Sequence, residues 1–391
     1  MTMHRWINRL GAICLAGLVA VSIASCRKEK ETILSYHDPA ATSGEKGDIT
    51  VDIPAGLYLC FLIQADGEAR SAVDEVQEEA SSTASEVDYY AQKVEDKEFS
   101  TWVVDRAQQL AANYAALMIW EDQFGLQMTD DQQSAAEYYA DYYWSQMGSF
   151  YESNGVAEST YKTFYEATSV KAALFDYYYG EGGELQVSDA DLKTGLQENY
   201  VLANTIQWSF TDEDGNEASD DEKKEMKSTL DGYVTRLNAG ESFAAVKAAY
   251  EEVTGTQQEE QEAATEAATE QSTDAYGNVV KNASPQDPNA SVFAGDETSS
   301  PSSYYAMLAE LENGKAEVLK FDDCYMLAVR KDILSDPYYF DELKESVRAL
   351  LKGDELEEKI EEFAKTLTVT KNESAIQYYA PKKIDYGTAA A

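Results

Sequence analysis

The chain contains 391 residues, of which 72 are acidic and 31 basic, so its formal net charge at pH 7 is −41. Such an acidic surface repels the phosphate backbone, which excludes nucleic acid as an expected partner. The only histidines are His4 and His37, too few for a histidine-based zinc site or for a Ser-His-Asp triad in a folded domain. No P-loop is present either, and we expect no metal ion and no cofactor.

Residues 1–25 have the layout of a secretion signal, because Arg5 and Arg9 precede an apolar run over residues 11–25 that is too short for a spanning helix. The small residues directly before Cys26 resemble the lipobox of bacterial lipoproteins. In that family the signal is cut before the cysteine, and the thiol carries a diacylglycerol. The resemblance implies lipidation of Cys26 and anchoring at the extracytoplasmic face of the cell membrane. The alternative is an ordinary cleaved signal with an incidental cysteine.

Residues 26–48 are expected to form a flexible tether between this anchor and the folded part, because the sequence is of low complexity. His37 falls within it. Basic residues near its start lie where anionic headgroups would attract them; they are Arg27, Lys28 and Lys30. After the signal, no apolar run approaches the roughly 20 residues of a membrane-spanning helix.

Residues 49–198 predict a helical module that opens with an apolar segment of strand-like or mixed character. Apolar residues in the module recur every three or four positions, which is typical of amphipathic helices. Capping boxes and a terminal glycine mark several helix ends. The predicted helices lie over residues 98–124 with Gly125 at the end, from Thr129 and Gln132 onward, over 157–179, and from Ser188 and Asp191 onward.

Many of the chain's 27 tyrosines fall in this module at helical spacing. Tyrosine-rich surfaces bind peptides well, since they offer rigid amphipathic area at a low entropic cost. The simpler interpretation is that each tyrosine packs in the core, which is the commoner outcome for any single residue. The number of tyrosines leaves room for some on a binding surface.

The period of the pattern changes to two at residue 200, which predicts a strand over 200–210. A helix with a Ser219 and Glu222 capping box follows, and then a shorter helix. Residues 255–290 are polar and repetitive and are expected to be disordered. After them we expect a short helix, two strands, a long helix, and a final strand with a short helix, the first four near residues 302–311, 316–321, 325–330 and 337–365.

This order of elements resembles the parvulin-type (PpiC) peptidyl-prolyl isomerase domain. LNAGESFAAVKAAY has a leucine, a glycine and a phenylalanine at that family's spacings, and LENGKAEVLKFDDCYMLAVR resembles its closing helix, turn and hairpin. With the lipobox and the flanking helices, the chain looks like the PrsA-like foldase lipoproteins and the related SurA chaperones. The resemblance implies an α+β fold: a helical SurA-N-like chaperone domain over 49–198, completed by 335–384, with an inserted parvulin-like α/β domain over 199–334.

The resemblance also implies a function, namely a membrane-anchored extracytoplasmic foldase or chaperone whose partners are unfolded or partly folded secreted proteins. Active parvulins carry one histidine on the first strand and another on the last, and the matching positions here hold Thr205 and Met326. The family's pocket residues have partial counterparts in Tyr304, Tyr305 and Met307, which we expect to bind clients. Without both histidines, the isomerase domain is expected to be degenerate.

Loss of the histidines weakens the case for catalysis without removing it. The rotation barrier of about 18–20 kcal/mol comes from amide resonance, and a pocket that desolvates and twists the prolyl amide lowers it without a nucleophile. A solute-binding or a structural surface lipoprotein would share the lipobox, the tether and the acidity. The clustered helices argue against the first and the compact α/β module against the second. Cys60 and Cys324 could pair, although buried thiols are the default.

Overall fold

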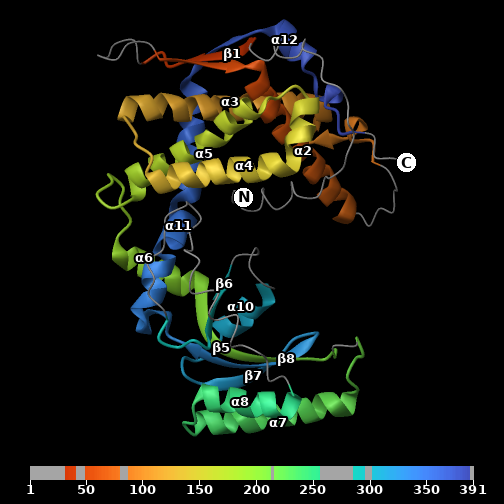
Figure 1. Ribbon diagram of the computed structural model, residues 1–391, viewed down its shortest axis with the longest axis vertical. Helices are drawn as coiled ribbons and strands as arrows, with labels where there is room; N and C mark the ends of the chain where they lie inside the picture. Colours follow the sequence, from red (N-terminus) through yellow and green to blue (C-terminus); the bar gives the residue numbers. More distant parts are fainter. Residues whose placement is uncertain are drawn as a thin grey trace. The chain divides into compact units, whose positions relative to one another are not determined.

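The computed structural model describes residues 31–40, 49–79, 87–212, 215–255, 285–295 and 302–387. The protein is a mixed α+β chain, mostly helical with small antiparallel sheets (Figure 1). It divides into two compact units. Among the described residues, unit 1 comprises those up to Gln186 and those from Lys352, while unit 2 comprises the residues between them. Unit 2 is therefore inserted in the sequence of unit 1.

The limits of unit 2 are wider than the expected insertion over 199–334. Helix α6 (Asp189–Asn199) and the first half of α11 (Pro337–Thr366) belong to it. The reason is close packing between these helices, since a Cβ added at Gly195 of α6 would lie 2.9 Å from Val347 and 3.0 Å from Leu351, both on α11. Glycine at this position allows the two helices to approach.

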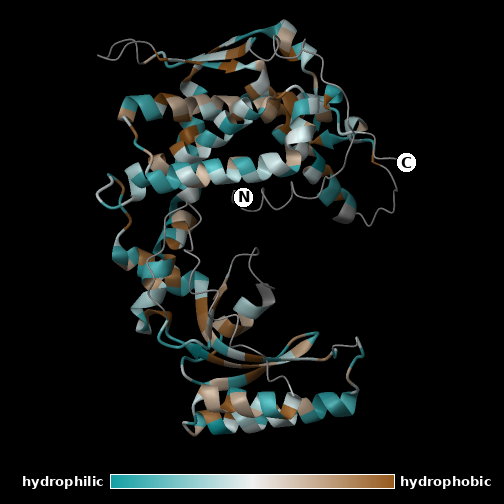
Figure 2. Ribbon diagram, viewed as in Figure 1, coloured by the Kyte–Doolittle hydropathy of each residue, from teal (hydrophilic) through white to brown (hydrophobic). Residues whose placement is uncertain are grey.

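Unit 1 is built around helices that share one hydrophobic core. Their predicted local signals are confirmed: Gly125 ends α3 in the left-handed conformation with φ 61°, and Thr129 forms the capping box with Gln132 at the start of α4. Figure 2 shows α4 in pale to teal colours along most of its length, which reflects its many hydrophilic residues, and few of its positions are buried. The elements are α2 (Ala55–Glu79), η2 (Tyr89–Ala91), β3 (Lys93–Val94), β4 (Lys97–Glu98), α3 (Phe99–Phe124), α4 (Asp130–Ser153) and α5 (Glu158–Tyr179).

A three-stranded antiparallel sheet completes unit 1, with β1 (Thr32–His37) between β2 (Thr50–Pro54) and β9 (Thr368–Lys371). The prediction of a flexible tether is therefore wrong for residues 32–37, and His37 lies in a strand. Ile33 and Leu34 are both buried, because an irregularity in the β1–β2 register turns two successive side chains inward. This bulge hides the strand's period of two from a sequence pattern. Of the rest of the tether, residues 26–30 and 41–48 lie outside the described residues.

The predicted final strand and short helix are confirmed as β9 and α12 (Glu373–Tyr378), followed by η5 (Pro381–Lys383). The segment returns to the core of unit 1, where Ala375, Ile376 and Ile384 are buried. Asn372 caps α12 by accepting a hydrogen bond from the backbone N–H of Ala375.

Unit 2 contains a four-stranded antiparallel sheet in the order β6-β5-β8-β7. Two helices pack on one face and a short helix on the other, which gives separate apolar clusters on the two faces (Figure 1). The predicted capping box of Ser219 and Glu222 is confirmed at the start of α7. The elements are β5 (Tyr200–Ser209), α7 (Asp220–Asn238), α8 (Phe243–Thr254), β6 (Ala290–Ala294), α10 (Ser302–Ala309), β7 (Ala316–Lys320), β8 (Cys324–Lys331) and η4 (Ile333–Ser335).

The expectation of disorder over residues 255–290 is wrong at the C-terminal end of that segment, where the chain is ordered and forms β6. Residues 285–290 lead into β6, which pairs with β5 over its whole length. Asp287 fixes this end because it accepts a hydrogen bond of 2.9 Å from Asn204 and forms an ion pair with Lys331. Residues 256–284 of the expected insertion lie outside the described residues.

The Asp287 contacts predict an acid-sensitive contribution to the stability of unit 2. Burial alone would raise the pKa of this carboxyl, but hydrogen bonds from Lys331, Asn204 and the Asn289 N–H, with the Lys331 charge, hold it well below its usual range. The stabilisation is therefore full above the unfolded pKa of about 3.9 and is lost as the pH falls below it. We expect Asp287→Asn to lower the free energy of unfolding at pH 7 by about 1 kcal/mol.

The measurement is urea unfolding followed by ¹⁹F NMR of protein labelled with 5-fluorotryptophan, in which Trp208 reports on unit 2 separately from the tryptophans of unit 1. The difference between Asp287→Asn and the unaltered protein should shrink at pH 3 and below. An equal difference at pH 7 and in strong acid would contradict the ionic origin of the effect.

Candidate functional site

The sheet of unit 2 brings Thr205 and Met326, the two positions expected to match the family histidines, onto neighbouring strands. In the β5–β8 pairing, Thr205 lies opposite Ala328 and Gln207 lies opposite Met326. Since side chains alternate between the faces of a strand, Thr205 and Met326 share the face that α10 covers. They are diagonal neighbours, a relation that puts Cα atoms about 7–8 Å apart.

The environments of these two residues differ. Met326 is 2% exposed and belongs to an apolar cluster with Ala328 and with Leu308 of α10. Thr205 is half-buried. Met326 therefore acts as a packing residue under α10, and Thr205 keeps a hydroxyl at the sheet surface.

A polar chain of three linked side chains, Gln207, Tyr304 and Cys324, lies on the same face of the sheet, and the sequence pattern did not reveal it. Gln207 Nε2 donates to the Tyr304 hydroxyl at 3.1 Å, and this oxygen lies 3.7 Å from Cys324 Sγ. Each strand residue is two positions from a predicted one, so the period of two could have pointed to both. Tyr304 comes from α10, and only the folded chain brings it to the strands.

The polar chain can donate hydrogen bonds but cannot act as a base near neutral pH. Burial raises the pKa of Tyr304 to about 12, and its hydrogen bond to Cys324 adds to the effect. Burial likewise raises the pKa of the Cys324 thiol. Both groups are protonated at pH 7, so they could hydrogen-bond a carbonyl oxygen of a bound peptide.

The three residues expected to bind clients lie on α10 and pack against the apolar cluster between this helix and the sheet. The Tyr304 ring packs against Phe321 with centroids 4.5 Å apart. The Tyr305 hydroxyl donates to the backbone carbonyl of Glu198. Met307 is partly buried against the same apolar cluster. Much of their surface is thus used in packing, and client binding by these residues stays a prediction.

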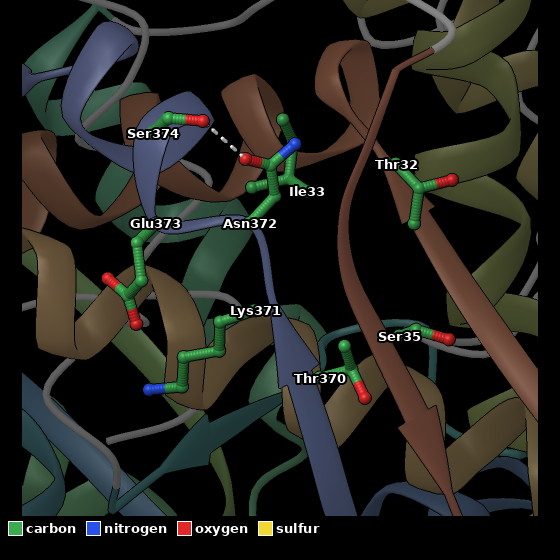
Figure 3. Close-up of a pocket in the computed structure, with 8 residues that line it drawn as sticks. All are labelled: Thr32, Ile33, Ser35, Thr370, Lys371, Asn372, Glu373 and Ser374. Carbon is green, nitrogen blue, oxygen red and sulfur yellow. Dashed lines mark hydrogen bonds between the residues drawn. The ribbon is translucent and has the colours of Figure 1, made fainter.

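A cavity of about 550 Å³ lies in unit 1, beside β1, β9 and the start of α12 (Figure 3). The Ser374 hydroxyl donates to Asn372 Oδ1 at 2.8 Å, and the Lys371 ammonium donates to Gln108. These three polar groups are therefore already paired within the protein. Its lining consists of Thr32, Ile33, Ser35, Thr370, Lys371, Asn372, Glu373 and Ser374.

The described residues also bear on the expectations about thiols, metal ions and the membrane. Cys60 and Cys324 are buried and form no disulfide bond with each other. Within the described ranges, no group of three or more His, Cys, Asp or Glu side chains could hold a metal ion. None of the helices described here is both long enough and apolar enough to cross a membrane. Cys26 and the signal over residues 1–25 lie outside the described residues.

Comparison with known proteins gives matches among solved structures alone, because no protein-family model and no curated protein matches the chain. The PrsA foldase from Lactococcus lactis matches 73% of this chain and 90% of its own at 15% identity and a TM-score of 0.33. PrsA from Streptococcus pneumoniae matches 77% and 92% at 14% identity and a TM-score of 0.30. PrsA from Bacillus subtilis matches 73% and 86% at 14% identity and a TM-score of 0.24.

The chain is thus similar to PrsA foldase structures over about three quarters of its length, at low identity, as the sequence motifs predicted.

Proposed function

We propose that this protein is a membrane-anchored extracytoplasmic foldase or chaperone for secreted proteins, with a degenerate peptidyl-prolyl isomerase unit. The observation that carries the proposal is the construction of unit 2. Its first strand, two helices, strand β6, short helix and closing hairpin support the resemblance to a parvulin-type domain. In that resemblance, Thr205 and Met326 stand for the family histidines, and the two residues lie on neighbouring strands. The lipobox-like residues before Cys26 support lipid anchoring.

Binding of unfolded segments places fewer demands on this unit than catalysis does. Secreted chains emerge with apolar segments and strand edges uncovered, where aggregation is fast. A chaperone anchored at the membrane would meet them at a high effective concentration. For catalysis, Gln207, Tyr304 and Cys324 offer hydrogen-bond donors without an imidazole network.

The test uses the chain from Arg27 onward in two assays on one preparation. We expect it to suppress the aggregation of an unfolded secreted protein, and to leave the cis/trans isomerisation of X-Pro peptides unaccelerated. Failure to suppress aggregation, with no acceleration, would overturn the proposal and favour a solute-binding or structural surface lipoprotein.

If isomerisation is accelerated, a pair of tyrosine variants shows whether the candidate site is responsible. Tyr304→Phe removes the hydroxyl but keeps the ring, and one lost hydrogen bond of about 1 kcal/mol lowers a rate about fivefold. Tyr233→Phe is the matched control, because its hydroxyl donates to Ala249 on the opposite face of the sheet. Equal rates in both variants would place the activity elsewhere.

A further inference from the structure

Helices α4 and α5 carry a row of tyrosines whose rings contact one another, some stacked and some edge-on, and whose outer members are exposed. We call Tyr138, Tyr139, Tyr142, Tyr143 and Tyr165 the tyrosine ladder. Neighbouring rings lie 5.2–6.4 Å apart between centroids, from Tyr138 on the surface to Tyr165 on α5. Exposed fractions are 65% for Tyr138, 44% for Tyr139 and 49% for Tyr142.

The inner and outer parts of the tyrosine ladder have different roles. Tyr143 and Tyr165 pack against the core of unit 1, and burial raises the pKa of both. The outer three rings leave much of their large contact area in water, and their hydroxyls make no hydrogen bond within the described part of the chain. Core packing thus explains the inner rings, and the outer rings form a rigid aromatic surface supported from below.

The charge around the tyrosine ladder is negative. No lysine or arginine occurs from residue 107 to residue 161, a stretch that includes all of α4. Glu137 and Asp141 are exposed one helical turn apart, and like charges at this spacing are unfavourable for a helix. Lys162 of α5 pairs with Asp141 at 2.8 Å, whereas Glu137 has no ion pair among the residues that the structure describes.

Aromatic rings flanked by carboxylates suit a cationic partner, and arginine more than lysine. A guanidinium is planar and weakly hydrated, so it stacks on an aromatic ring while its edge binds a carboxylate. The same contact occurs inside unit 1, where the Arg70 guanidinium carbon lies 4.4 Å from the ring centroid of Tyr89 and 4.3 Å from that of Tyr386.

We propose that the outer tyrosine ladder, with Glu137 and Asp141, binds extended arginine-containing segments of unfolded proteins. This inference rests on the proposed function and names the class of client segment that unit 1 selects. The arginine side chains lie on the Tyr138, Tyr139 and Tyr142 rings, and the carboxylates pair with their outward edges. Acidic segments are repelled, and so is the equally acidic α4 of a second copy.

The test is fluorescence anisotropy with labelled peptides of equal length, in which arginine, lysine or glutamate alternates with glycine and serine. The protein is the chain from Arg27 onward, at an ionic strength of about 0.15 M to limit non-specific attraction. We expect the arginine peptide to bind several-fold more tightly than the lysine peptide, and the glutamate peptide not to bind. Equal binding of arginine and lysine peptides would overturn the inference.

Three variants separate the ladder from the general acidity of the surface. Tyr138→Ser with Tyr142→Ser should weaken arginine-peptide binding about tenfold, since two stacked cation–aromatic contacts are lost. Tyr138→Phe with Tyr142→Phe keeps the rings and should retain binding. Tyr378→Ser removes a similarly exposed tyrosine, 47% exposed, from α12 and should change nothing. Retained binding in the double serine variant would overturn the inference.

The aggregation assay on the same preparations distinguishes the two proposals. Suppressed aggregation without arginine selectivity would remove the tyrosine ladder as a client site and leave the chaperone function standing. Selective arginine-peptide binding without suppressed aggregation would support the tyrosine ladder as an arginine-binding surface and would contradict the chaperone function.

Discussion

Arg70→Ala is expected to lower the free energy of unfolding of unit 1 by about 3–5 kcal/mol, because it leaves a buried carboxylate without its charged partner. Asp66 on α2 is 0% exposed, and Arg70 Nε donates to its Oδ2 at 2.6 Å. The Tyr386 hydroxyl donates to the same oxygen. The Asp66 Oδ1 atom has no hydrogen-bond partner within the described structure, and the neutral Tyr386 hydroxyl that would remain on Oδ2 does not neutralise the charge.

The same ¹⁹F NMR measurement applies, with Trp102, Trp120 and Trp144 reporting on unit 1. The double variant Asp66→Ala with Arg70→Ala should recover part of the free energy of unfolding that Arg70→Ala loses, because it no longer buries an unpaired carboxylate. Lys97→Ala is the control, because it breaks an ion pair with Asp105 in which both side chains are 52% exposed. Water screens such a pair, so its loss should change the free energy of unfolding much less. An Arg70→Ala effect no larger than this control would refute the role of the buried pair.

Leu34→Ala should destabilise unit 1 by about 2–5 kcal/mol, the range for truncating a buried leucine. Leu34 is 0% exposed and lies in β1, the central strand of its sheet. Had residues 26–48 formed a tether throughout, this substitution would have no effect on unfolding. The experiment therefore tests directly whether this part of the chain is folded.

Urea unfolding of unit 1 provides the measurement, and Ser35→Ala provides the control. Ser35 is the next residue of the same strand but is only half-buried and has a small side chain. We expect its substitution to change the free energy of unfolding by no more than about 0.5 kcal/mol. Equal effects of the two substitutions would contradict the burial of Leu34.

Strand β1 also bears on the proposed anchoring. It begins at Thr32, six residues after Cys26, and an extended chain of that length spans at most about 20 Å. If Cys26 is lipidated, unit 1 begins close to the membrane surface, where secreted chains emerge.

The sequence by itself determined the elements whose signals are local. Gly125 ends α3, and the boxes of Thr129 and Ser219 start α4 and α7, because each depends on hydrogen bonds within a few residues. The period of two likewise predicted strand β5, which carries Thr205. These features could be predicted since they need no partner from elsewhere in the chain.

Tertiary structure alone decided what depends on distant partners. Strand β1 is held by β9, more than 300 residues away, and its bulge obscures the alternation that would have revealed it. Helix α10 buries Met326 and brings Tyr304 to Gln207 and Cys324, so it determines which strand residues pack and which stay polar. Burial and hydrogen bonding between remote segments depend on the folded chain, so a local sequence pattern cannot predict them.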